Sequence, residues 1–485
     1  MTVSSTIVAP ATIPGTGAVA IIRLSGPESL SITDKVVSFR KGSASESAGY
    51  TLKYGEIPGL DDVLVSVFRA PHSYTGEDAV EISYHASSYI ASQLVQKLID
   101  AGAVPAEPGE FTRRAFVNGK MDLAQAEAVA DVIASENEAA HRVAMNQLRG
   151  GYSSELQQLR TSLVDITSLM ELELDFSEED VEFADRTQLM ELLDASLVHI
   201  AKLTDSFRLG NAIRTGVPVA IVGATNTGKS TLLNAILGEE RAIVSSVAGT
   251  TRDTIEELFN IGGTHFRLID TAGIRDTDDE IESIGIDRSY SKLLMADIVL
   301  HVLDMSLPVD ELVSAANHIV SKVDLSSQKL LFVFNKADLV IPDIASGAEK
   351  GLNSGDFAAN SCVNKIVTEF NKGVKCADNK YDVLVISAKS SVGVDDLKNA
   401  LIDTQDARIK QSGSSTLVTN ARHYNALCSA SRALEMVRNG LASHTPTDLV
   451  AQDLREALYY LGTITGEIST DEVLGNIFAK FCIGK

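Results

Sequence analysis

The feature that most constrains this chain is a glycine-rich segment between an apolar run and a helix-forming run. Its residues are Gly223-Ala-Thr-Asn-Thr-Gly228-Lys229-Ser230, preceded by PVAIV and followed by TLLNAIL. This is the GxxxxGK[ST] pattern, in the strand–loop–helix context that a phosphate-binding loop requires. The glycines let backbone N–H groups converge on phosphate oxygens, and the helix N-terminus adds a favourable dipole. We expect Lys229 to neutralise the β- and γ-phosphates and the Ser230 hydroxyl to ligate Mg²⁺.

A second strand-end motif, Asp270-Thr-Ala-Gly273, closes the apolar run FRLI. Its aspartate is expected to hold Mg²⁺ through water, and the Gly273 N–H to meet the γ-phosphate. The segment Gly249-Thr250-Thr251-Arg252-Asp253 is the candidate switch I. Thr251 would ligate Mg²⁺ once the γ-phosphate is present.

Two further motifs predict that the base is guanine. Asn335-Lys336-Ala-Asp338 closes the run LLFVF, and Ser387-Ala388-Lys389 closes VLVI. The Asp338 carboxylate can accept from the N1–H and the 2-amino group of guanine, both of which adenine lacks. The Lys336 stem should pack on the base, and the Ser387-Ala388 backbone fits a contact to guanine O6.

Any one of these motifs could be an ordinary loop, but four in order, each at the carboxyl end of a predicted strand, predict a GTP site. Ile274 stands where many regulatory GTPases place a glutamine that orients the attacking water, so Glu282 is the candidate for this catalytic work. The predicted GTP-binding residues are Gly223, Asn226, Thr227, Gly228, Lys229, Ser230, Thr231, Asp270, Gly273, Asn335, Lys336, Asp338, Ser387 and Ala388.

Four stretches of the chain differ in character. Short β-branched runs with Gly/Pro turns predict strands over residues 7–89, and apolar residues at three- and four-residue spacing predict long helices over 122–214. From 217 to 411, apolar runs alternate with helical segments, which is typical of a parallel sheet with crossover helices. We therefore predict a multidomain α/β plus all-α protein. Its parts are an N-terminal α+β domain (1–121), a helical domain in two parts (122–214 and 412–485) and an inserted Ras-like P-loop G domain (215–411).

The amino-acid composition restricts how the protein could bind nucleic acid and in which cellular compartment we expect it. The net charge of −23 argues against coating nucleic acid by bulk electrostatics, so RNA contact would need a local basic patch or a basic partner. An equally plain interpretation is that the charge keeps a long helical surface soluble. The four scattered cysteines favour a reducing cytoplasm, and neither a membrane span nor a targeting signal is predicted.

Several segments resemble the tRNA-modifying GTPase family MnmE (TrmE). They are GATNTGKS, AGTTRD, DTAGIR followed by Glu282, PGTGAVAIIRLSG, YTGEDAVEISYHA, PGEFTRRAFVNGKMDLAQAEAVADVI and the C-terminal FCIGK. The resemblance covers nearly the whole chain, and FCIGK and GEFTRRAF…KMDLAQAEA are its most specific parts. It implies an N-terminal folate-binding and dimerisation domain, a central helical domain and a G domain inserted into the helical domain.

The resemblance also implies a reaction. The family works with the FAD-binding partner MnmG (GidA), in a heterotetramer or larger complex. Together they add an aminomethyl or carboxymethylaminomethyl group to C5 of the wobble uridine of certain tRNAs. The one-carbon unit comes from a tetrahydrofolate derivative bound by the N-terminal domain of a constitutive homodimer. The expected cofactors are therefore GTP, Mg²⁺, K⁺ and a tetrahydrofolate derivative, with FAD on the partner.

In this family the G domains dimerise across their switch regions when potassium is bound. Asn226 matches the residue whose side-chain carbonyl ligates the ion, and Ser245, Val247 and Thr250 match the loop that wraps it. The ion replaces an arginine finger against the transition state, and Glu282 matches the residue that orients the water. From the residues alone, Asn226 would be a loop-stabilising side chain. Ser245 and Val247 also differ from the commonest residues of that loop.

For folate, Arg23, Glu81 and Lys120 match the family's pocket residues, and Lys485 approaches from the C-terminal tail. A folate glutamate tail needs cations, and a pterin edge needs a carboxylate that accepts paired N–H groups. Without the resemblance, Arg23 and Lys120 would be interpreted as solvated surface charges. Cys482 is either a thiol made reactive by the nearby cation or, the favoured interpretation, a small apolar residue in a docked tail.

Two other functions stay open on the sequence. One is a regulatory or ribosome-assembly GTPase without modification chemistry, which the strand-rich N-terminus and the FCIGK tail argue against. The other is a binding module in which GTP only sets conformation, which Glu282 and the potassium loop disfavour. Residues 340–382 are a longer segment than the family usually has at this point, and they predict an added loop and helix.

Overall fold

The computed structural model describes residues 5–175, 186–238, 257–269, 293, 295–341, 360–376, 380–412, 416–443, 445–468, 471–479, 481 and 484. The chain divides into two compact units. The first comprises Met1–Ala134, Ala144–Lys202 and Asn425–Lys485, and the second comprises Ser135–Val143 and Leu203–Tyr424.

A seven-stranded sheet forms the N-terminal part of the first unit, in the order β3-β4-β5-β6-β2-β1-β7. Its strands are β1 (Ile7–Pro10), β2 (Ala20–Ser25), β3 (Ser38–Phe39), β4 (Thr51–Ile57), β5 (Asp61–Phe68), β6 (Ala79–Tyr84) and β7 (Val104–Pro105). Helices α1 (Ser29–Val36) and α2 (Ser88–Asp100) cover one face and bury the apolar side chains of the strands. In β2 this alternation buries Ile22 and Leu24 beneath the helices and places Arg23 on the opposite face.

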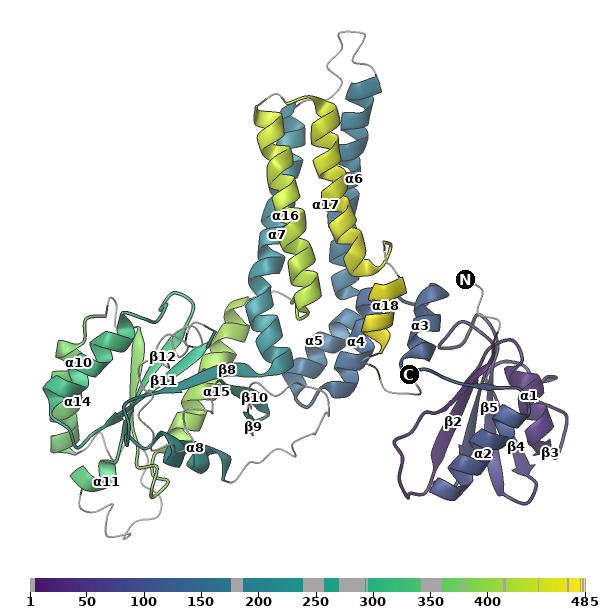
Figure 1. Cartoon of the computed structure of the whole chain (residues 1–485), viewed down its shortest axis with the longest axis horizontal. Coiled ribbons are helices and arrows are strands. Elements are labelled where there is room, and N and C mark those ends of the chain that lie inside the picture. Colours follow the sequence, from purple (N-terminus) through teal and green to yellow (C-terminus); the bar gives the residue numbers. More distant parts are fainter. Residues whose placement is uncertain are drawn as a thin grey trace. The chain divides into compact units, whose positions relative to one another are not determined.

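Long helices form the remainder of the first unit, and their buried faces follow the helical period. Along α6 (Gly151–Asp175), Leu156, Leu159, Leu163 and Ile166 are buried at three- and four-residue spacing. Figure 1 shows α17 (Thr447–Thr465) beside α6, and the two are in extensive contact. The first unit also contains α3 (Glu110–Val117), α4 (Leu123–Ala134) and α18 (Asp471–Phe478), whereas α5 (Glu138–Leu148), α7 (Arg186–Thr215) and α16 (Ala421–Ala442) each belong partly to the second unit.

A six-stranded sheet forms the second unit, in the order β13-β12-β11-β8-β10-β9. Its strands are β8 (Val217–Val222), β9 (Glu257–Ile261), β10 (Thr264–Ile269), β11 (Ile298–Asp304), β12 (Lys329–Asn335) and β13 (Tyr381–Val385). Every neighbouring pair is parallel except β9 with β10. The apolar runs of β11 and β12 are buried almost throughout, as expected for a parallel sheet covered on both faces.

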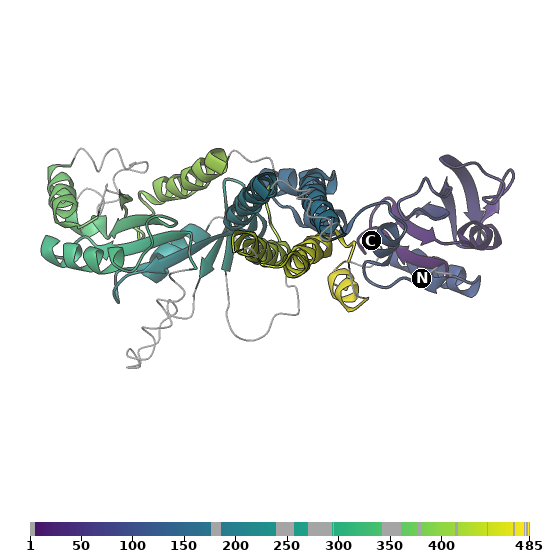
Figure 2. The same cartoon turned by 90° about the horizontal axis from the view of Figure 1, so that it is seen from above.

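Helices cover both faces of this second sheet. Helices α8 (Lys229–Leu237) and α15 (Val394–Ser412) pack on one face, and α10 (Val309–Val320) and α14 (Ser361–Gly373) on the other. Figure 2 shows α10 and α14 side by side. Helix α14 lies in the segment 340–382, where the sequence predicts an added helix, while residues 342–359 lie outside the described ones.

The parallel strands end at one edge of the sheet, which brings the strand-end motifs together. β8 ends directly before Gly223, β12 ends at Asn335, and β13 ends two residues before Ser387. The predicted fold class, with an α+β N-terminal domain, a helical domain and a P-loop G domain, is confirmed. Within the described part of the chain, no helix combines the length and the apolar character needed to cross a membrane.

Candidate functional site

The phosphate-binding loop runs from the end of β8 to the start of α8, and two of its glycines stand where no side chain fits. A Cβ on Gly223 would lie 2.4 Å from the carbonyl oxygen of Val302. A Cβ on Gly228, whose φ is +94°, would lie 2.2 Å from Nδ2 of Asn335. These close approaches explain why the loop needs glycine at both positions.

Lys229 begins α8 and bends back over the loop. Its Nζ donates to the carbonyl oxygens of Gly223 (2.8 Å) and Ala224 (2.7 Å). Burial lowers the pKa of this ammonium from its ordinary value. The buried Thr227 hydroxyl also donates to the Ala224 carbonyl, at 3.0 Å. The predicted Mg²⁺ ligand Ser230 follows in the first turn of α8, directly after Lys229.

Asn226 lies at the exposed tip of the phosphate loop. Its φ of +61° is in the left-handed region, where asparagine is one of the few residues tolerated apart from glycine. Within the described part of the chain, no hydrogen bond of its side chain is present. The backbone conformation alone is therefore one reason for asparagine here, and the exposed amide is available for a second role.

Asn335 connects the two halves of the predicted nucleotide site. Its side chain is 2% exposed and joins two loops. Nδ2 donates to the Thr227 carbonyl at 2.8 Å, and Oδ1 accepts from the Ala388 N–H at 2.9 Å. The phosphate loop and the Ser387-Ala388 loop are thereby fixed relative to each other through one amide group.

The predicted base-recognition residues lie around Asn335. The Ser387 hydroxyl donates to Oδ1 of Asp338 at 2.7 Å. Lys336 adopts a left-handed φ of +64°, and its Nζ donates to Oδ2 of Asp304 at 2.7 Å. Burial would raise the pKa of the Asp304 carboxyl, but hydrogen bonds from Lys336 and Ser306 hold it below its ordinary value.

Sequence reasoning missed Asp304. It is the last residue of the apolar run IVLHVLD, and β11 pairs it in register with Asn335 at the end of β12. The sequence did contain a signal for Asp304: a carboxylate at the end of the apolar run that precedes the NKxD strand.

Several predicted site residues lie outside the described part of the chain. They are the predicted Mg²⁺ and switch residues Thr251, Asp270 and Gly273, the predicted K⁺ loop Ser245, Val247 and Thr250, the catalytic candidate Glu282, and the tail residues Cys482 and Lys485. Their roles stay predictions. Among the residues that are described, no cluster of three or more His, Cys, Asp and Glu side chains is placed to hold a metal.

In the N-terminal sheet, Arg23 and Glu81 are partners across neighbouring strands. They pair in register between β2 and β6, and both Nε and Nη2 of Arg23 reach Oε1 of Glu81, at 2.9 and 2.8 Å. The guanidinium also lies over the rings of Tyr74 (5.5 Å) and Phe111 (5.7 Å). The structure thus brings together a cation, a carboxylate and two aromatic rings on the face that α1 and α2 leave uncovered.

Lys120 approaches the same region through one loop. Its Nζ donates to the Pro71 carbonyl at 3.0 Å, and Nδ2 of Asn118 donates to the Thr75 carbonyl at 2.7 Å. Tyr74, which lies over Arg23, belongs to this loop. The loop from Pro71 to Thr75 therefore links Lys120 to the Arg23–Glu81 pair.

The C-terminal tail contacts the same sheet. A Cβ on Gly484, whose φ is +95°, would lie 2.1 Å from the carbonyl oxygen of Pro10 at the end of β1. The neighbouring residue of β1, Ala9, pairs in register with Arg23. Phe481 packs with Phe478 and Leu123. Gly484 thus lies one strand away from the Arg23–Glu81 pair.

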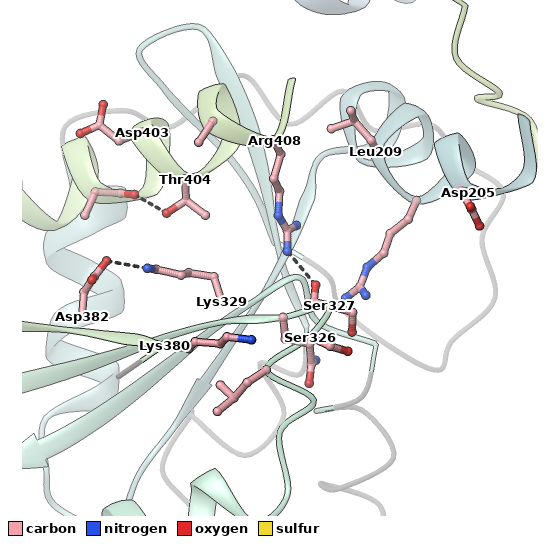
Figure 3. A pocket seen from close by; sticks show the side chains of 15 residues that line it. Asp205, Leu209, Ser326, Ser327, Lys329, Lys380, Asp382, Asp403, Thr404 and Arg408 are labelled. Atoms are coloured by element: carbon pink, nitrogen blue, oxygen red, sulfur yellow. Dashed lines mark hydrogen bonds and ion pairs between the residues drawn. The ribbon is translucent and has the colours of Figure 1, made fainter. Parts of the chain in front are cut away.

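A cavity of about 870 Å³ lies elsewhere in the second unit (Figure 3). Lys329, the first residue of β12, and Lys380, directly before β13, are in its lining, so it opens at the edge opposite the nucleotide motifs. Lys329 pairs with Asp382 at 2.8 Å. Beside the cavity, the buried carboxylate of Asp297 is held by an arginine from α7 and an arginine from α15, Arg208 and Arg408. The cavity contains none of the predicted site residues.

Comparisons with known proteins cover the chain from end to end. The family described as "GTP-binding protein TrmE N-terminus" matches residues 6–120, and that described as "MnmE helical domain" matches 123–482. The tRNA modification GTPase MnmE of Flavobacterium johnsoniae is 48% identical over 487 residues, covering 99% of both chains. The protein of the same description from Bacteroides thetaiotaomicron is 48% identical over 486 residues, again covering 99% of both.

Among solved structures, the FeoB G-domain of Methanococcus jannaschii is 24% identical, with a TM-score of 0.24. The match covers 39% of this chain and 98% of that one.

Proposed function

Because this chain belongs to the MnmE (TrmE) family of tRNA modification GTPases, we propose that it binds GTP at the carboxyl edge of its parallel sheet and that GTP hydrolysis serves tRNA modification. The observation that carries the nucleotide part is the linkage of the loops through Asn335, which joins the Thr227 carbonyl to the Ala388 N–H. A base site with fixed walls can bind a flat purine without first ordering its loops.

The base is guanine in this proposal. Oδ1 of Asp338 accepts from Ser387, and Oδ2 has no hydrogen-bond partner among the described residues. A carboxylate at this position accepts from the two guanine donors that adenine lacks. Lys229 would exchange the carbonyls of Gly223 and Ala224 for phosphate oxygens when the nucleotide binds.

The proposed ligand of the N-terminal domain is a tetrahydrofolate derivative. Arg23, Glu81 and the rings of Tyr74 and Phe111 offer a cation, a carboxylate and flat apolar surface within one small area. This set suits the donor edge and the ring face of a pterin. Lys120 and Lys485 are the proposed cations for the glutamate tail.

The remaining elements of the proposal rest on the family. Ser230 and Thr251 would hold Mg²⁺. The K⁺ ion would supply positive charge against the transition state. The residues proposed to hold K⁺ are Asn226, Ser245, Val247 and Thr250. Glu282 would orient the attacking water, and Asp270 and Gly273 would meet the metal-bound water and the γ-phosphate. The fit of Asn226 is supported by its exposed amide, which no described residue engages.

At the level of the assembly, we expect a homodimer whose G domains meet across their switch regions. An FAD-binding MnmG-like partner would complete the reaction, which adds an aminomethyl or carboxymethylaminomethyl group to C5 of the wobble uridine of tRNA. A cytoplasmic location belongs to the same proposal. A regulatory or ribosome-assembly role without modification chemistry has no support from relatives that match over the full length.

The proposal is tested by GTP turnover in KCl and in NaCl, because both salts screen charge equally and only one supplies the ion. We expect faster turnover in KCl. Asn226→Gly keeps the left-handed backbone but removes the amide, so it should lose the potassium effect while still binding GDP. Equal wild-type rates in the two salts would contradict potassium-dependent catalysis.

Glu282→Ala should lower GTP turnover by about a hundredfold with nearly unchanged GTP affinity.

A further inference from the structure

The ammonium of Lys336 is held by a carboxylate that belongs to none of the guanine-nucleotide motifs. Nζ of Lys336 lies 2.7 Å from Oδ2 of Asp304, and the side chains are 30% and 13% exposed. An ion pair that is partly withdrawn from water is held more firmly than a surface pair. The Lys336 stem is the part of the NKxD motif that should cover the face of the base, so its direction matters for binding.

The carboxylate is itself fixed on its other side. Oδ1 of Asp304 accepts from the Ser306 N–H at 3.0 Å and from the Ser306 hydroxyl at 2.6 Å. The intervening Met305 N–H donates to the carbonyl of Asn335 at 3.0 Å. The turn after β11 is thereby tied to the end of β12. One carboxylate oxygen anchors the turn and the other is left to hold Lys336.

We infer that Asp304 is a positioning residue for guanine recognition, acting through Lys336: it holds the lysine in the direction in which its stem packs on the base. The inference rests on the proposed nucleotide site. Four strand ends carry the motifs of that site, and the inference adds the end of β11 as a fifth. It makes Asp304 a determinant of nucleotide affinity, although Asp304 itself does not touch the base.

The chain contains a matched control for the local turn. Asp324 precedes Ser326 with the same spacing, and its Oδ1 accepts from the Ser326 N–H at 3.0 Å and from the Ser326 hydroxyl at 2.5 Å. Its Oδ2 accepts from the Ser327 hydroxyl at 2.7 Å and not from a lysine. Asp324 also precedes β12, at the sheet edge opposite the nucleotide motifs. Removing Asp324 therefore removes the same kind of turn contact without touching Lys336.

The test is a double-mutant cycle on the full chain, read out by the affinity for a fluorescent GDP. Asp304→Ala and Lys336→Ala should each weaken binding by about tenfold, which corresponds to about 1.4 kcal/mol. The double variant should be no weaker than Lys336→Ala alone, because Asp304 acts only through that lysine. Asp304→Glu should restore part of the affinity, and Asp304→Ala should raise the KM for GTP more than it lowers kcat.

Asp304→Asn covers the case in which Asp304→Ala folds poorly, because the amide oxygen can still accept from Ser306. It should bind GDP as weakly as the alanine variant, whereas Asp324→Ala should bind like wild type. Unchanged or tighter binding by Asp304→Asn, or losses that add in the double variant, would overturn the inference. Asp338→Asn distinguishes failure of the proposed guanine site from failure of the inference about Asp304. If Asp338→Asn leaves the preference for GTP intact, the proposed guanine site is wrong, irrespective of the result for the Asp304 variants.

Discussion

At the scale of single residues, His301 is a titratable group buried in the second sheet. It lies in β11, is 4% exposed, and its ring contacts that of Phe332. Its Nδ1 is buried, and no described residue forms a hydrogen bond with it. Burial, with smaller repulsion from His318 and Lys229, lowers the pKa of His301 to about 4 from an ordinary value of 6.5. The folded protein therefore holds this imidazole neutral.

A pH dependence of stability follows from this. Between pH 6.5 and pH 4 the unfolded chain binds a proton at this histidine and the folded chain does not, so the free energy of unfolding should fall as the pH falls. The full effect of His301 should be about 3 kcal/mol. His301→Leu should have a shallower loss of stability in this range, measured by urea unfolding. The control is the exposed His72, which belongs to the first unit and is not among the groups that lower the pKa of His301. His72→Gln should keep the wild-type slope, and a parallel slope for His301→Leu would show that another group is responsible.

The residue scale also shows where sequence reasoning stops. Strand-end motifs predicted Lys336 and Asp338 as site residues because the chemistry of a guanine nucleotide requires a fixed spacing of these residues along the chain. Asp304 was missed because its partner is set by strand register, which joins positions far apart in the sequence. The same limit applies to Arg23 and Glu81: the family resemblance suggested both, but only the pairing of β2 with β6 shows that they bind each other.

At the scale of elements, the buried carboxylate of Asp297 joins three of them. It stands directly before β11 and is 2% exposed. Arg208 of α7 contacts one carboxylate oxygen, and Nη1 of Arg408 of α15 lies 3.2 Å from the other. Nη2 of Arg408 also donates to the Ser327 carbonyl at 2.8 Å. The helix before the sheet and the helix after it are thus tied to the same residue.

Removing this carboxylate should leave two cations without their partner. We expect Asp297→Ala to lower the free energy of unfolding by roughly 2–4 kcal/mol, less than for a fully buried pair because the arginines are partly exposed. Asp382→Ala breaks the exposed Lys329 pair beside the same cavity and should cost less than about 1 kcal/mol. Thermal and urea unfolding of both variants gives the comparison. Equal losses of unfolding free energy in the two variants would mean that the burial of the Asp297 carboxylate does not determine the cost of removing it.

Elements were easier to predict than their partners. The continuous apolar runs of the second sheet and the three- and four-residue spacing of α6 are local signals, so strands and helices were found where the sequence indicated them. The two-residue strands β3 and β7 could not be predicted, because a period cannot be recognised over so short a run.

At the scale of the whole molecule, the tail joins distant parts of the chain. Gly484 lies against Pro10, with no space for a side chain and with a left-handed φ. Gly484→Ala should therefore displace the tail from β1 and weaken the binding of a tetrahydrofolate derivative, measured by calorimetry, while GTP turnover in KCl stays at the wild-type level. Gly475 in α18 has nothing within 4 Å of an added Cβ, so Gly475→Ala is the matched control. Equal folate affinity in the two variants would argue against a role for the tail.

The contact of Gly484 with Pro10 has a consequence for biosynthesis. The N-terminal sheet leaves the ribosome first, but its neighbour Gly484 is translated only after the whole of the second unit. At ordinary elongation rates this delay is on the order of tens of seconds. Throughout that time Pro10, at the end of β1, is without its neighbour Gly484. A ribosome that stalls before the tail would release a protein with an intact GTPase unit and an unfinished N-terminal surface.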